Sequence, residues 1–180
     1  MNRAREESEP NAAWRDLAAL VPDWPAPPGM LGFVTGRAGG VSRGPWGLDG
    51  DRPGGLNLGA RCGDDPEAVR ENRRRLAAAL PSEPVWLRQV HGVAVHVARG
   101  PLEDEPVADA VVSDRPGLVL SVLTADCLPV MFADDRGRAV GVAHAGWRGL
   151  SAGVLERTVE AMHTLLPSGA VLQAWMGPAI

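Results

Sequence analysis

The chain has 180 residues, of which 45% are hydrophobic, and a formal net charge of −4. This size and apolar content predict a single globular domain with a real core, not a disordered chain. The arginines are scattered along the chain and form no basic stripe, which argues against a nucleic-acid-binding protein. Because the chain has two cysteines, Cys62 and Cys127, it does not fit a disulfide-rich secreted scaffold.

Neither the N-terminal stretch nor the apolar runs of the chain suggest a membrane protein. The N-terminal stretch MNRAREESEP is charged and polar with no apolar segment behind it, so we expect no signal peptide. The longest apolar run, GLVLSVLTADCLPVMFA, is interrupted by Asp126 and is too short to span a bilayer. We therefore expect a soluble cytoplasmic protein with no nucleic-acid or membrane partner. The sequence leaves the oligomeric state open.

The first third of the chain predicts little regular structure. We expect an N-terminal extension over 1–30 that contains a short helix at 11–20, and then a strand at 31–35. Residues 36–63 are rich in glycine and predict a long loop. A loop of that length inside a compact domain is usually functional or disordered.

The rest of the chain predicts strands interspersed with two helices. Asp65 at a capping position and Pro66 in the first turn predict a helix over 65–80. Strands are predicted at 85–98 (with a break near 91–92), 109–114, 118–124, 128–134, 138–145 and 170–176. An amphipathic helix is predicted over 149–166, with an apolar face made of Leu150, Val154, Leu155, Val159 and Met162. Because the later apolar runs are nearly continuous, we expect these strands to be covered on both faces.

The four histidines divide into two kinds. His163 lies in the last turn of a predicted helix, where it favours the helix dipole, and His96 alternates with valines in a strand, so both fit structural roles. His91 and His144 instead lie at strand ends beside glycine-containing turns, in QVHG and AHAG. Cys127, in TADCLPV, lies between two apolar segments in the same kind of place. Three strand-end positions can converge on one edge of a sheet.

Two imidazoles and a thiolate have three interpretations here. They are a three-ligand set for zinc, and a catalytic zinc keeps its fourth position open. They also suit a metal-free hydrolase in which Cys127 is the nucleophile and His91 or His144 the base. Alternatively, Cys127 is a small buried residue and both histidines are simply hydrogen-bonded. The spacing leaves these alternatives open, because no short-range ligand pair such as C-x-x-C is present.

Five blocks of the sequence together resemble the YfiH-like laccase-domain family, also called the polyphenol oxidase or purine nucleoside phosphorylase family. The blocks are QVHG, TADCLPVMFAD, AHAGWRG followed by a helix, the terminal GPAI, and the series GGVS, NLG and GDDPEAVRENRRRL. They run in order between Leu31 and Ile180, which we take as a single domain of that family. Each block alone is a weak signal, and the set is specific.

The resemblance implies an α+β fold of four α-β-β-α layers around a buried mixed sheet. It also implies that His91, Cys127 and His144 bind zinc and are catalytic. The implied activity is phosphorolysis of adenosine, inosine and methylthioadenosine, together with deamination of adenosine. The implied partners are therefore a purine nucleoside and phosphate.

The older family name implies copper-dependent phenol oxidation. A blue-copper centre needs two histidines and one cysteine, which this chain has. A multicopper oxidase also needs a trinuclear cluster with many more imidazoles, and only His96 and His163 remain for it. Copper in the same site, with weak oxidase activity as a side reaction, is the expectation that follows, since Cu²⁺ outcompetes Zn²⁺ at most such sites.

The implied reactions point to further residues. Deamination needs a group that shuttles a proton, and Asp126 beside Cys127 is the candidate, although a role in orienting a ligand or loop fits it equally. Phosphorolysis needs phosphate held against the ribose, and Arg37 and then Arg148 are the candidates, with surface ion pairs as the alternative for each. The remaining substrate-binding candidates are Gly39, Gly40, Asn57 and Gln89.

The sequence departs from the family at its C-terminal end. Family members continue beyond GPAI, whereas this chain stops at Ile180, so we expect a domain that lacks the C-terminal part of the family. Activity could then be lost even with an intact metal site. Two other classes stay open, a metal-independent Cys–His hydrolase or deamidase and a catalytically inactive binding domain.

Overall fold

The computed structural model describes residues 12–49 and 52–180 and divides the chain into two compact units. The first contains Gly36–Pro81 together with the described residues up to Ala18. The second contains Ala19–Thr35 and Ser82–Ile180. The expectation of one domain over 31–180 behind an N-terminal extension stays a prediction, and residues 1–11 of that extension lie outside the described part.

The first unit contains the predicted helix and the glycine-rich segment. Its elements are a 3₁₀ turn η1 (Ala12–Asp16), strand β3 (Ala38–Ser42), a 3₁₀ turn η2 (Gly44–Trp46) and helix α1 (Pro66–Ala78). Helix α1 begins as predicted. The Asp65 side chain accepts a hydrogen bond from the backbone N–H of Glu67. Pro66, in the first turn, has no backbone N–H group that would need an acceptor. The prediction of an unstructured loop over 36–63 is wrong, since β3 and η2 lie within it.

A buried asparagine of α1 organises the glycine-rich segment. The fully buried Asn72 amide donates to the Gly55 and Asn57 carbonyls and to the Ser42 hydroxyl, and its oxygen accepts the Val41 N–H. Loop backbone away from a sheet ladder needs such partners when it is buried. The segment is therefore ordered by a polar side chain, a feature that hydrophobic patterning does not reveal.

The second unit contains most of the strands and both remaining helices. Its sheet strands are β5 (Val95–Val97), β6 (Ala110–Ser113), β8 (Leu128–Asp134), β9 (Val140–Ala145) and β10 (Leu172–Met176). Shorter strands form two pairs, β1 (Ala18–Leu20) with β2 (Val34–Thr35) and β4 (Pro84–Val85) with β7 (Val119–Leu120). The helices are α2 (Trp147–Ala152) and α3 (Val154–Leu165).

The main sheet has five strands in the order β10-β8-β9-β6-β5. Strands β5 and β6 are parallel, whereas the other three neighbouring pairs are antiparallel, so the sheet is mixed. Every residue of β6 is buried, and β9 is buried apart from its first residue. The predicted α+β class with a buried mixed sheet is confirmed.

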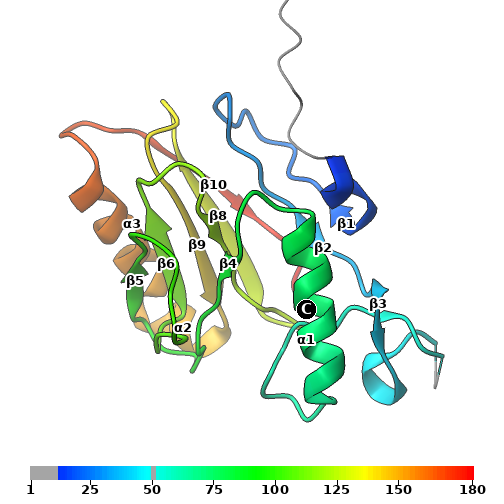
Figure 1. The fold of residues 1–180 in the computed structure, drawn as a ribbon. Coiled ribbons are helices and arrows are strands. Elements are labelled where there is room, and N and C mark those ends of the chain that lie inside the picture. The colour runs from blue at the N-terminus through cyan, green and yellow to red at the C-terminus, as the bar shows by residue number, and fades with distance from the viewer. Residues whose placement is uncertain (1–11, 50–51) are drawn as a thin grey trace, which may run out of the picture. The chain divides into compact units, whose positions relative to one another are not determined.

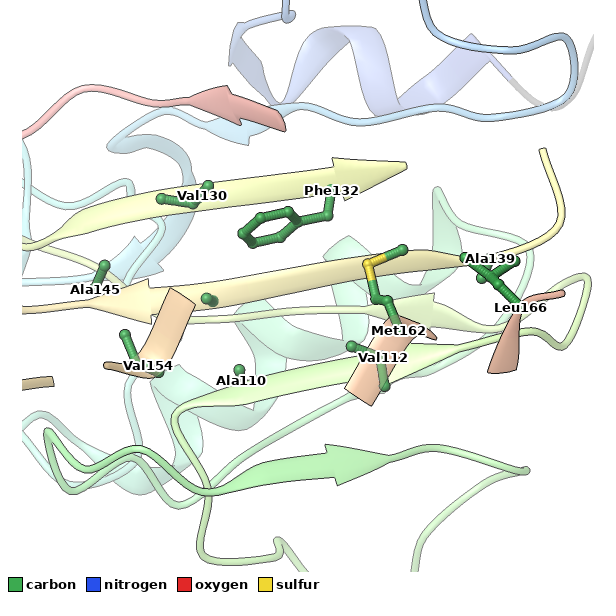
Figure 2. Close-up of a cluster of buried hydrophobic side chains, with 10 residues drawn as sticks. Ala110, Val112, Val130, Phe132, Ala139, Ala145, Val154, Met162 and Leu166 are labelled. Atoms are coloured by element: carbon green, nitrogen blue, oxygen red, sulfur yellow. The ribbon is translucent and has the colours of Figure 1, made fainter. Parts of the chain in front are cut away.

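Apolar side chains cover both faces of this sheet, as the continuous runs predict. Helix α3 lies along one face (Figure 1), and Met162 and Val154 of α3 are fully buried there among sheet residues (Figure 2). Gly141 of β9 leaves room for this packing, because a Cβ there would lie 3.1 Å from the Met162 sulfur. On the other face Val111 and Val142 form a second cluster with buried residues of the β4 region.

The predicted helix over 149–166 is interrupted. Gly153 has φ +97°, a left-handed conformation that ends α2 and lets α3 begin with a new direction. Val154 and Met162 face the core as predicted, but Leu150 lies on the separate helix α2 and is exposed. The sequence pattern could not show this break, because a lone glycine is also tolerated inside a helix.

A buried aspartate closes the hairpin between β8 and β9. The Asp134 carboxylate accepts hydrogen bonds from the backbone N–H groups of Arg136 and Arg138 and from the Arg138 guanidinium, at 2.6–3.2 Å. The side-chain bond with Arg138 is the main cause that lowers the pKa of Asp134 to about 2. Asp134 therefore stabilises the folded state in its ionised form.

We predict that Asp134→Asn lowers the free energy of unfolding by about 1–3 kcal/mol at neutral pH, because a charge-assisted pair is lost. A lowered pKa contributes stability that is complete above the unfolded pKa, about 3.9, and is lost as the pH falls toward the folded value of about 2. Urea unfolding from pH 7 to pH 2 should show the difference between variant and unmodified protein constant down to about pH 4 and shrinking below it. A difference that does not change with pH would contradict this.

Candidate metal centre

The register of β8 and β9 brings Cys127 and His144 to the same end of the sheet. His144 is the next-to-last residue of β9 and pairs with Pro129 of the antiparallel β8. Cys127 immediately precedes β8. Because the start of one antiparallel strand meets the end of the other, the two residues are neighbours although 17 positions separate them in the sequence.

His91 reaches the same place from a turn that precedes β5. Within the part of the chain that the structure describes, it is the one non-glycine residue with positive φ, at +60°. A left-handed backbone is unfavourable for a residue with a Cβ, so the surroundings must hold it. The histidine thus sits in a strained turn, which is a common feature of functional sites.

The three side chains form a compact cluster. One potential ligand atom from each of His91, Cys127 and His144 lies within 4.8 Å of the others. The Cys127 sulfur is 3.8 Å from His91 Nε2, and the two imidazole rings are 4.7 Å apart at 75°. Sulfur and nitrogen on one tetrahedral zinc lie about 3.6 Å apart, given ordinary bond lengths. The residues therefore fit a metal ion.

The three side chains of the cluster differ in solvent exposure. His144 is only 3% exposed, Cys127 is half-buried and His91 is exposed. A metal held by these residues would have one ligand in β9, one immediately before β8 and one exposed to solvent. Such a three-ligand set leaves a coordination position for water or substrate.

The fully buried carboxylate of Asp109 contacts two residues of the cluster. One Asp109 oxygen is 2.9 Å from Nδ1 of His144, and the carboxylate also accepts hydrogen bonds from the backbone N–H groups of Val90, His91 and Gly92. With Nδ1 engaged, Nε2 of His144 is the nitrogen available to a metal. Asp109 was not among the predicted site residues, and the signal it leaves in the sequence is an aspartate at the start of the apolar stretch DAVVSD.

Gly146 keeps the space between the three side chains free. A Cβ at this position would lie 2.8 Å from a ring carbon of His91 and 2.9 Å from the Cys127 sulfur. Its φ of −61° and ψ of 154° are open to any residue, so backbone conformation is not what selects glycine here. The selection comes from the close approach of the ligands.

Asp126 immediately precedes Cys127, and Gln89 lies two residues before His91. The Asp126 side chain is exposed, and its backbone carbonyl accepts the N–H of Ile180. The Gln89 amide pairs at both ends with the backbone of Leu123, donating to its carbonyl at 2.8 Å and accepting its N–H at 2.7 Å. Gln89 thus ties the segment that leads to Cys127 to the segment that leads to His91.

Arg148 lies in the first turn of α2, a helix of six residues. Its guanidinium stacks over the Trp147 ring, 4.7 Å from the ring centre. Trp147 is 71% exposed, so it is not the packing plug that a tryptophan between glycines can be. The structure thus presents an exposed aromatic and cationic pair directly after Gly146.

The other predicted substrate-binding residues belong to the first unit, where they brace the glycine-rich segment. Arg37 donates to the carbonyls of Gly47 and Pro45, both at 2.7 Å. Asn57 donates to the Asp64 carboxylate at 2.9 Å. A Cβ at Gly40 would overlap the Gly55 carbonyl, and Gly39 has φ +100°. These contacts account for the residues structurally, and their binding roles stay predictions.

Known proteins resemble this chain in both sequence and structure. The family model described as multi-copper polyphenol oxidoreductase laccase matches residues 32–180. Purine nucleoside phosphorylase YfiH of Escherichia coli is 50% identical over 163 residues, and purine nucleoside phosphorylase PA4543 of Pseudomonas aeruginosa is 49% identical over 167. The crystal structure of the Neisseria meningitidis protein NMB0706 is similar with a TM-score of 0.77 and 45% identity, over 89% of this chain and 62% of that one.

The chain spans less than two thirds of these relatives. The alignments cover 89% of this chain but 63% of the E. coli protein, and 91% of this chain but 62% of the P. aeruginosa protein. The cluster of His91, Cys127 and His144 lies inside the matched region. Among the described residues, no helix combines the length and apolar character that a membrane crossing requires.

We predict that Gly146→Ala lowers Zn²⁺ affinity by at least about tenfold without unfolding the protein, because the new methyl group would displace His91 or Cys127. Gly100→Ala is the matched control, since a Cβ at Gly100 meets no atom within 4 Å. Competition with a chromophoric chelator measures both affinities, and circular dichroism checks folding. Equal zinc affinity for the two variants would contradict the role given to Gly146.

Proposed function

This chain belongs to the family described as multi-copper polyphenol oxidoreductase laccase, and on that premise we propose that it is a metal-dependent enzyme acting on purine nucleosides. The observation that carries the proposal is the convergence of His91, Cys127 and His144, with a buried carboxylate behind His144. The names of the relatives, which are purine nucleoside phosphorylases, supply the substrate class. We take phosphorolysis of adenosine, inosine or methylthioadenosine as the main reaction and adenosine deamination as a second.

Zinc is the metal we propose for this site. One thiolate, two imidazoles and an open position are a ligand set typical of catalytic zinc. Copper can bind the same set and give a weak oxidase side reaction. The chain has four histidines in total, and His96 and His163 lie on β5 and at the end of α3, outside the cluster. They could not supply the imidazoles of a trinuclear copper centre.

The protein's own residues would have distinct roles in the reaction. His91, Cys127 and His144 hold the metal, which supplies a Lewis acid when bound. Asp126, exposed beside Cys127, is our candidate for moving a proton during deamination. Arg148 and Arg37 are our candidates for phosphate, because a guanidinium can contact two phosphate oxygens at once.

One observation favours a second function, a metal-free hydrolase or deamidase. The 3.8 Å separation of the Cys127 sulfur and His91 Nε2 is near the reach of a nucleophile–base pair. In such enzymes a third group orients the base. Here the orienting carboxylate is bonded to the other histidine, His144, an arrangement that suits a metal ligand better.

We predict that Cys127→Ala abolishes zinc binding and nucleoside turnover together, whereas Cys62→Ala, which changes the other cysteine, preserves both. The test is zinc content per chain by elemental analysis, with chromatography of products after incubation with adenosine and phosphate. Each variant should be purified without a His-tag or added metal.

Three results would change the assignment. Full zinc and full turnover in Cys127→Ala would refute the proposed site. Turnover that resists chelators but is blocked by iodoacetamide would favour the Cys–His hydrolase. Tight purine binding without turnover in the unmodified protein would indicate a binding domain.

A further inference from the structure

We propose that Asp109 is a positioning residue that sets two of the three metal ligands at once, the His91 turn through its backbone and the His144 ring through Nδ1. The inference rests on the metal site proposed above and concerns how this chain prepares that site. It is carried by the hydrogen bonds of a single fully buried carboxylate.

The first half of the arrangement is a backbone cradle. Three consecutive N–H groups point at the carboxylate, with nitrogen–oxygen distances of 3.2 Å for Val90, 2.8 Å for His91 and 2.7 Å for Gly92. Successive N–H groups of this kind form an anion-binding concavity. Here the anion is the side chain of Asp109, the residue immediately before β6, so the cradle fixes the turn to the start of that strand.

This cradle explains the strained conformation of His91. A positive φ is unfavourable for histidine, and the turn would relax without something to hold it. The hydrogen bonds to the Asp109 carboxylate stabilise the conformation in which all three N–H groups point toward it. The same conformation brings His91 Nε2 to 3.8 Å from the Cys127 sulfur.

The second half concerns the His144 ring. Asp109 Oδ1 lies 2.9 Å from His144 Nδ1, and the His144 backbone N–H donates to the Asp109 carbonyl at 2.7 Å. The hydrogen bond made by one ring nitrogen decides which nitrogen carries the proton. An accepting carboxylate places the proton on Nδ1 and leaves the Nε2 lone pair for a metal.

Because one side chain serves both ligands, its loss would misplace both. In Asp109→Asn only one side-chain oxygen remains an acceptor, so the amide NH₂ must face either the cradle or the His144 ring. Asp134 offers a matched comparison within the same sheet. It is equally buried and also accepts backbone N–H groups, but its other partner is Arg138, and it closes the hairpin at the opposite end of β8 and β9.

The first test compares Asp109→Asn with Asp134→Asn for affinity toward Zn²⁺ alone, by chelator competition. We expect a loss of about 10- to 100-fold for Asp109→Asn, as for other carboxylate partners of metal-bound histidine, and a change within about threefold for Asp134→Asn. Equal affinities of the two folded variants would overturn the proposal. So would an unmodified protein that binds no Zn²⁺.

The second test uses the unmodified, metal-free protein and does not depend on how either variant folds. Long-range ¹H–¹⁵N NMR correlations report which nitrogen of His144 is protonated. We expect a proton on Nδ1 and none on Nε2, and the opposite tautomer would overturn the proposal. Neither test uses a nucleoside, so Zn²⁺ binding that depends on Asp109 in a protein without turnover would leave this inference standing while the proposed function fails.

Discussion

The candidate site depends on one constraint, the burial of the Asp109 carboxylate. A carboxylate without solvent needs hydrogen-bond donors for both oxygens, since an unpaired buried charge is strongly destabilising. In this fold its hydrogen-bond partners are the backbone N–H groups of the 90–92 turn and the His144 ring. The hydrogen bonds that satisfy the Asp109 carboxylate therefore also hold His91 and His144 in place.

Cys127, the third residue of the cluster, is placed by strand register. Cys127 precedes β8, and the antiparallel pairing with β9 sets it beside His144. A slip of one residue would turn His144 to the other face of the sheet, away from Asp109. The packing of α3 on one face and of the β4 region on the other keeps that register fixed.

Elements marked by local sequence signals could be predicted, whereas features that depend on distant residues could not. Capping by Asp65 and the apolar run of β8 are local signals, and both elements appear where they were expected. The role of Asp109 is invisible locally, because its partners lie 17 to 35 residues away. The strand in the glycine-rich segment was missed because the buried amide of Asn72 orders it, rather than any hydrophobic period.

The family description and the names of the similar proteins differ. The family description names multicopper laccases, whereas the similar proteins of E. coli and P. aeruginosa are named as purine nucleoside phosphorylases. The chain's donor set argues against a multicopper site, because two of its four histidines, His96 and His163, lie outside the His91, Cys127 and His144 cluster. The central claim is a mononuclear zinc site made by His91, Cys127 and His144. Its most direct test is X-ray absorption at the zinc edge of the zinc-loaded protein. The account predicts one sulfur at about 2.3 Å and nitrogen or oxygen ligands at about 2.0–2.1 Å. A zinc environment without sulfur would contradict it.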